Sequence, residues 1–147
     1  MITINIKGDD KVMQDGQNDY FLHENITSQI IGSAFEVINE LGSGFLESVY
    51  VKAMLLVLNQ KGFTALDQYP MDVRFRGVCV GEFYADIIVD DKVIVEIKAI
   101  KALKPEHQAQ VINYLTATGI EVGLLLNFGN PKLEFKRLTR IKGYNEY

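Results

Sequence analysis

Three ionisable side chains interrupt the most apolar stretch of the chain, and their types suit phosphate chemistry. Asp86 precedes an Ile-Ile-Val run, and Glu96 and Lys98 lie within Val-Ile-Val-Glu-Ile-Lys. Placing a charge among apolar side chains is costly unless the charge is paired or binds a metal. Carboxylates are ligands that a hard divalent cation prefers. Two carboxylates and a lysine in this pattern therefore suggest a site for a divalent cation and a phosphate.

The position of these three residues depends on a predicted hairpin. β-branched residues are enriched on both sides of Asp90-Asp91-Lys92, which predicts two strands joined by a tight turn. Side chains two residues apart on a strand point to the same face, so Glu96 and Lys98 project together. The turn brings Asp86 back beside them. One alternative stays open here: a half-exposed strand has the same alternation, and Glu96 and Lys98 would then form a weak surface ion pair.

Length and composition favour one globular domain. The chain has 147 residues, of which 48% are hydrophobic. We expect a polar, partly mobile N-terminal arm over residues 1–24 and a single domain over residues 25–147. The net charge of −4 gives no general attraction to nucleic acid, so such binding requires a local basic patch. The single cysteine, Cys79, excludes an internal disulfide and fits a reducing, cytoplasmic compartment. We expect no membrane span.

The apolar spacing predicts two helices, three or four strands, a helix and two more strands. Helices are expected at 25–41, between residues 44 and 62, and at 105–118. Strands are expected at 2–6, within 63–80 with turns near Pro70 and at Arg76-Gly77, in the hairpin, at 122–128 and at 133–141. This order indicates an α/β domain with a mixed central sheet and one crossover helix.

Three further segments carry candidate functional residues. Glu47 begins the second helix and borders its apolar stripe, although an acid in a first turn also simply stabilises a helix. Gln110 and Tyr114 share one face of the third helix, where packing is the simpler role. Basic residues gather around the last strand, where they could equally form a solvated edge: Lys132, Lys136, Arg137, Arg140 and Lys142.

These motifs resemble those of a known family. Gly44-x-x-Glu47-x-x-Tyr50 is similar to the signature of the small bacterial and archaeal GxxExxY proteins, within the PD-(D/E)XK nuclease superfamily. The resemblance covers about residues 25 to 142. It includes the Asp86, nine residues, Glu96-x-Lys98 core and the Gln110-x-x-x-Tyr114 motif. It implies an α/β domain with a restriction-endonuclease-like mixed central sheet flanked by helices.

The resemblance also implies a metal-dependent nuclease that hydrolyses phosphodiester bonds, with DNA as the partner. Asp86 and Glu96 would be the main ligands of Mg²⁺, for which Mn²⁺ can substitute, together with the backbone carbonyl of Ile97. Glu47 would complete the acidic cluster, directly or through water. A hard cation held in this way neutralises charge on phosphate oxygens and lowers the pKa of a bound water.

The remaining motif residues are implied to act beside the metal. Lys98 would orient the attacking water or stabilise developing negative charge. Gln110 would position Lys98 or a phosphate, with Tyr114 in support. The N-terminus of the Pro105 helix, with Lys101, Lys104 and His107 nearby, offers amides and positive charge to a backbone phosphate.

Two other functions compete with the nuclease interpretation. The first is a catalytically silent nucleic-acid-binding or accessory protein of the same fold. The second is a structural or protein-interaction domain, for example a homodimer whose charges form buried pairs. A homodimer also fits the nuclease, because a double-strand cut needs two sites and the chain contains one set of motifs.

Overall fold

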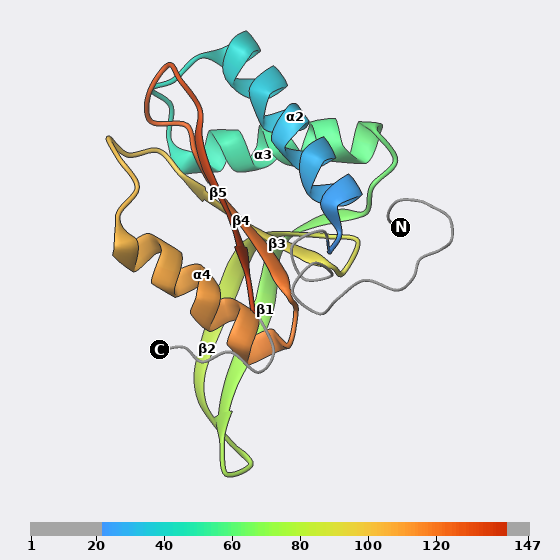
Figure 1. Cartoon of the computed structure of the whole chain (residues 1–147), viewed down its shortest axis with the longest axis vertical. Coiled ribbons are helices and arrows are strands. Elements are labelled where there is room, and N and C mark those ends of the chain that lie inside the picture. The colour runs from blue at the N-terminus through green and yellow to red at the C-terminus, as the bar shows by residue number, and fades with distance from the viewer. Residues whose placement is uncertain (1–21, 141–147) are drawn as a thin grey trace.

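The computed structural model describes residues 22–140. The elements follow one another as α2 (Glu24–Leu41), α3 (Glu47–Gln60), β1 (Ala65–Phe75), β2 (Val78–Val89), β3 (Val93–Lys98), α4 (Pro105–Thr118), β4 (Val122–Asn127) and β5 (Glu134–Thr139) (Figure 1). This order confirms the predicted α/β succession. The strand expected at residues 2–6 lies outside the described residues, and the division at residue 24 stays a prediction.

The five strands form one mixed sheet in the order β1-β2-β3-β4-β5. Only β3 and β4 pair in parallel, and α4 is the crossover between them; the other neighbouring pairs are antiparallel. Helix α4 begins at Pro105, whose fixed φ suits a first turn, and is capped after Thr118 by Gly119, with a φ of +77°. The mixed sheet and its single crossover helix are therefore as predicted.

Apolar side chains bury both faces of the sheet. Val93, Val95 and Ile97 point to the side covered by α2 and α3, whereas Ile94 and Leu125 contact α4 on the other side. The fold therefore has three layers, with two helices on one face and one on the other (Figure 1). Across the described range, no helix combines the length and apolarity needed to cross a membrane.

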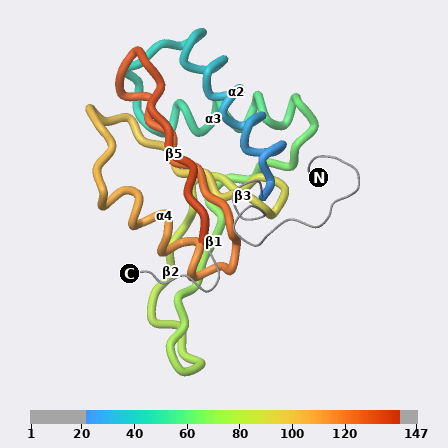
Figure 2. Tube along the Cα trace, in the orientation of Figure 1, coloured from blue at the N-terminus to red at the C-terminus, as the bar shows by residue number. Residues whose placement is uncertain are grey.

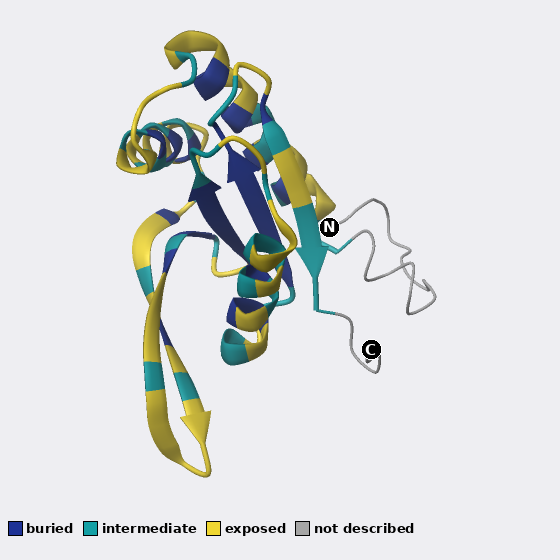
Figure 3. Cartoon of the chain, turned by 90° about the vertical axis from the view of Figure 1, so that its left-hand side faces the viewer, coloured by how far each residue is buried: buried dark blue, intermediate teal, exposed yellow. Residues whose placement is uncertain are grey.

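The hairpin of β1 and β2 extends well beyond the rest of the sheet as an arm, and most of that arm is exposed (Figure 3). The predicted turn at its tip is confirmed, since Arg76 and Gly77 both have positive φ, 52° and 80°. The turn predicted near Pro70 is wrong. Pro70 lies inside β1 and is paired with Tyr84. Because β1 is an edge strand, a residue without an N–H is tolerated there.

Candidate active site

The site forms where β2 and β3 part. The two strands pair from Val89 opposite Val93 to Ile87 opposite Val95, and the regular ladder ends there. Beyond this point, two side-chain carboxylates accept backbone N–H groups. Glu96 Oε1 accepts the backbone N–H of Asp86, and Asp86 Oδ2 accepts the backbone N–H of Ile97, both at 2.8 Å. Each acid thus satisfies an amide that the separating strands leave unpaired, and this exchange holds the two side chains next to each other.

Both carboxyl groups resist ionisation in this setting. Glu96 is only 4% exposed, and burial, followed by the negative charge of Asp86, raises its pKa to about 8. Burial likewise raises the pKa of Asp86, against the hydrogen bond from the Ile97 amide, while the charge of Glu47 raises it further. The charge of Lys98 lowers both pKa values without reversing either shift.

The donor set fits a divalent cation. Within residues 22–140, neither carboxylate lies within 4.0 Å of a cationic side chain, so their charge is not neutralised by direct contact. The second oxygen of each group, Asp86 Oδ1 and Glu96 Oε2, accepts no backbone N–H in that range. Carboxylate oxygens of this kind are the ligands that Mg²⁺ and similar hard cations prefer. The open alternative of a surface ion pair between Glu96 and Lys98 is wrong, because Glu96 is buried.

Glu47 lies near this pair, but its carboxylate does not form a compact group with the other two. It is the first residue of α3 and is exposed, and its negative charge raises the pKa values of Asp86 and Glu96. In the described chain, the three-residue group of ligating side chains whose atoms all lie within 4.8 Å is another one, formed by exposed residues of the arm: Asp72, Cys79 and Glu82. Glu47 therefore shares the electrostatic field of the two acids from a greater distance.

Tyr50 holds the loop that precedes Glu47. Its hydroxyl donates to the carbonyl oxygen of Gly42 at 2.6 Å and accepts the N–H of Phe45 at 3.2 Å. Its buried ring stacks on Phe128, with centroids 4.6 Å apart and planes 9° apart. The tyrosine thus fixes the loop before α3 against the end of β4, and this places Glu47 near the strand ends.

Replacing Tyr50 by phenylalanine tests this role. The variant keeps the stacked ring and loses both hydroxyl hydrogen bonds, so we expect about 1 kcal/mol less stability. For a domain of this size, that corresponds to a melting temperature lower by about 3–5 °C. Thermal unfolding by circular dichroism measures the change. The control is Tyr84→Phe on the exposed part of β2, which should leave the melting temperature unchanged.

The lysine and the helical motif lie on the same side of the sheet as the acids. Lys98 is half-buried and follows Glu96 by two residues on β3. Tyr114 is 8% exposed on α4, and burial, then the charges of Glu96 and Asp86, raise its pKa. Gln110 lies one turn earlier and is half-buried, but no hydrogen bond joins it to Lys98 in the part of the chain described. Its positioning role stays a prediction, as does the metal contact of the Ile97 carbonyl.

One buried polar residue near the site was missed from the sequence. Asn127 is the last residue of β4, is fully buried and lies opposite Lys98 in the parallel pair. The signal available was an amide in an otherwise apolar run directly before a Gly-Asn-Pro turn. Its four hydrogen bonds connect the loops that follow β3 and β4.

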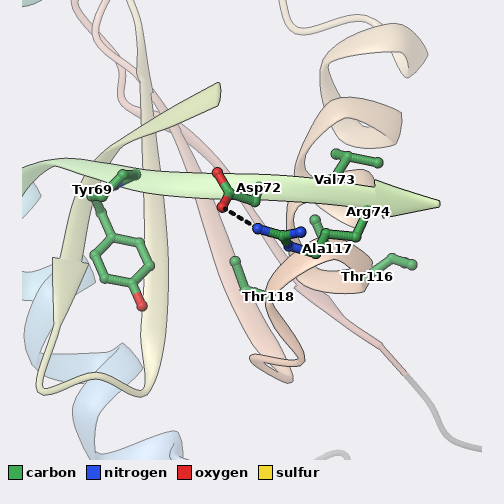
Figure 4. A pocket seen from close by; sticks show the side chains of 8 residues that line it. Tyr69, Asp72, Val73, Arg74, Thr116, Ala117 and Thr118 are labelled. Atoms are coloured by element: carbon green, nitrogen blue, oxygen red, sulfur yellow. Dashed lines mark ion pairs between the residues drawn. The ribbon is translucent and has the colours of Figure 1, made fainter. Parts of the chain in front are cut away.

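A separate hollow of about 560 Å³ lies between β1 and the last turn of α4 (Figure 4). Tyr69 lies at one end of the hollow. The ion pair of Arg74 and Asp72, 3.8 Å apart, lines it together with Thr118. None of the motif acids lines it. The carboxylate site is therefore not part of this hollow.

Comparison with known proteins identifies a family and two similar solved structures. A family model described as the PD-(D/E)XK nuclease superfamily matches residues 24–138. Among solved structures, SSO0001 is similar with a TM-score of 0.48 and 16% identity, over 84% of this chain and 62% of that one. An alkaline exonuclease from Laribacter hongkongensis is similar with a TM-score of 0.48 and 16% identity, over 88% and 72%. No curated protein matches the sequence. Because the family match spans most of its length, this chain belongs to the PD-(D/E)XK nuclease superfamily.

Proposed function

We propose that the protein is a metal-dependent nuclease that hydrolyses phosphodiester bonds in DNA and belongs to the GxxExxY group. The observation that carries the proposal is the pair of carboxylates, half-buried Asp86 and buried Glu96, held together where β2 and β3 diverge. Membership of a nuclease superfamily supports a nucleic-acid substrate. The presence of Gly44, Glu47 and Tyr50 at the motif spacing supports the narrower group.

The proposed cofactor is Mg²⁺, with Mn²⁺ as a substitute. Asp86 and Glu96 hold the ion, aided by the Ile97 carbonyl, and Glu47 joins from the start of α3, directly or through water. Two partly or fully buried carboxylates with raised pKa values suit a dication, because the ion removes the repulsion and burial cost that disfavour their charged forms. When bound, the ion neutralises charge on the phosphate oxygens and lowers the pKa of a nearby water.

The other residues act on the phosphate and on the attacking water. Lys98 orients that water for in-line attack or stabilises the negative charge that builds on the phosphate oxygens. Gln110 positions Lys98 or a phosphate oxygen. Tyr114, whose pKa is raised, keeps its proton and remains a hydrogen-bond donor beside the acids.

A cleavage assay with three DNA substrates tests the proposal. Supercoiled plasmid, linear duplex and single-stranded DNA are incubated with Mg²⁺, with Mn²⁺ and with EDTA. We expect products with either ion and none with the chelator, while the substrate that is cut fastest identifies the strand preference. Cleavage that persists in EDTA would contradict the metal assignment.

A catalytically silent nucleic-acid-binding protein is the second candidate function. The observation that favours it is the position of Glu47, which forms no compact three-acid group with Asp86 and Glu96 in the residues described. This candidate predicts that DNA shifts the protein in a gel with Mg²⁺ present and is recovered uncut. Cleavage that depends on Lys98 would exclude it.

We also propose a cytoplasmic location, which suits the free thiol of Cys79. A homodimer would supply the second site that a double-strand cut needs. Analytical ultracentrifugation with and without a short DNA duplex tests the dimer. A single species of monomer mass under both conditions would contradict it.

A further inference from the structure

Asn127 joins the β3–α4 loop (residues 99–104) to the β4–β5 loop (residues 128–133). Its Oδ1 accepts the N–H groups of Ile100 and Gly129 at 2.9 and 3.1 Å. Its Nδ2 donates to the Ile100 carbonyl and to Glu134 Oε1, both at 3.0 Å. The two backbones are so close that a Cβ on Gly129 would lie 1.9 Å from the Ile100 oxygen. A fully satisfied buried amide therefore fixes the loops to each other.

Further hydrogen bonds extend this connection toward the surface. Glu134 Oε1 also accepts the N–H of Leu103 at 3.2 Å, and Asn130 Nδ2 donates to the carbonyl of Lys101. Both loops lie at the same end of the sheet, on the upper left of the trace (Figure 2). We call the two loops together the rim. Its backbone is held at several points, so the side chains that it carries start from fixed positions.

The rim concentrates positive charge in an acidic protein. Residues 99–104 and 128–133 contain three lysines and no aspartate or glutamate, whereas the whole chain has a net charge of −4. Lys101, Lys104 and Lys132 are all exposed. Such a local excess attracts a polyanion even when the overall charge does not.

The rim lies directly beside the carboxylate pair. β3 and β4 are parallel, so both loops leave the same edge of the sheet, and Lys98 is opposite Asn127. Glu96 precedes the β3–α4 loop by only a few residues on β3. The rim thus begins at residue 99, three residues after Glu96 along the chain.

We propose that Lys101, Lys104 and Lys132 bind phosphate groups of the nucleic-acid strand beside the bond to be cut, and that Asn127 is the positioning residue that holds these lysines in place. The proposal rests on the proposed function for its ligand. Binding and cleavage are measured separately, so the two can fail independently.

Anisotropy of a fluorescein-labelled DNA duplex, and of its single strand, measures binding at a series of NaCl concentrations. The protein carries Glu96→Gln so that the probe stays intact. We expect Lys101→Ala, Lys104→Ala and Lys132→Ala, combined, to raise Kd at least about tenfold at low salt. The logarithm of the association constant decreases with the logarithm of the salt concentration. For the duplex, this slope should become shallower by about 0.9 for each phosphate that a lysine no longer neutralises. The matched control is Lys92→Ala, an exposed lysine in the β2–β3 turn.

Equal Kd values and salt slopes for the triple variant and the control would overturn the rim as a phosphate site. Absence of any DNA binding by the parent protein would do the same. If the parent binds DNA through these lysines but the wild-type chain cuts no substrate, the nuclease proposal fails and the rim stands.

Asn127→Ala tests the positioning role, because it leaves every lysine in place. We expect a lower salt slope and weaker binding, as for the triple variant, with melting temperature recorded as a check on folding. Asn130→Ala, which removes an exposed connection to Lys101, is the second variant if Asn127→Ala does not fold, and it should lower the slope by a smaller amount. A folded variant of either kind with the parent's Kd and salt slope would overturn the positioning role.

Discussion

Replacing Lys98 by alanine is expected to lower the DNA cleavage rate by about a hundredfold to a thousandfold while the fold persists. Removal of one preorganised group that stabilises charge in a transition state has effects of this size. Lys98 is half-buried at the end of β3, and its charge lowers the pKa values of Asp86 and Glu96. In the proposed mechanism, Lys98 is the cationic side chain two residues after Glu96 on β3 that acts on the phosphate and the attacking water.

Single-turnover cleavage of the preferred substrate at saturating Mg²⁺ measures this loss. Lys92→Ala is the matched control, because that lysine is exposed in the turn at the other end of β3 and should leave the rate unchanged. Asp86→Ala, tested in parallel, should lower the rate at least as much through loss of a metal ligand. Cleavage that survives both active-site substitutions would come from a contaminating nuclease and would discredit the site.

The sequence alone predicted the strands and the turn that carry the candidate site. The β-branched runs around residues 90–92 predict the hairpin, period-two alternation places Glu96 and Lys98 on one face, and the turn brings Asp86 back beside them. These are local properties of the chain. They do not reveal that β2 and β3 part at this point, because that depends on which backbone amides find partners in the assembled sheet.

Residues whose roles depend on distant partners were the ones that the sequence could not place. In the sequence, Asn127 interrupts an apolar strand. Only the folded chain brings Ile100, Gly129 and Glu134 to its amide, with which they form four hydrogen bonds. Pro70 predicts a turn because proline has no N–H to donate to a neighbouring strand. On the edge strand β1, one side of the strand needs no such donor, so proline is tolerated there. Tertiary context decides both cases.

Replacing Glu96 by glutamine is expected to abolish cleavage and, in metal-free protein at pH 8, to increase stability. Burial and Asp86 raise the pKa of Glu96 from 4.5 to about 8. Between these values the folded state binds more protons than the unfolded state, so the stability of the metal-free wild type falls as pH rises. At 1.36 kcal/mol per pKa unit, the loss between pH 4.5 and pH 8 is at most about 4–5 kcal/mol.

Glutamine removes this dependence and preserves the local hydrogen bonding. Its oxygen can still accept the Asp86 N–H, and its amide can donate to the Asp86 carboxylate. The free energy of unfolding, measured by urea titration in EDTA from pH 5 to pH 8, should therefore vary less in the variant. The two proteins should differ most at the highest pH. A wild type whose stability rises over this range would contradict the raised pKa.

Addition of Mg²⁺ should narrow the difference in stability between the two proteins. A ligand that binds only the folded state stabilises it by about 2.7 kcal/mol at a hundred times its Kd. The cation competes with protons for Glu96, so its stabilising effect on the wild type should increase from pH 6 to pH 8. Glu96→Gln loses a charged ligand and should gain little from the ion at either pH. Equal stabilisation of both proteins would mean that the ion binds elsewhere, for example at the exposed group of Asp72, Cys79 and Glu82 on the arm. A charge that costs stability without metal and is needed for metal binding is what a catalytic carboxylate, rather than a structural one, should show.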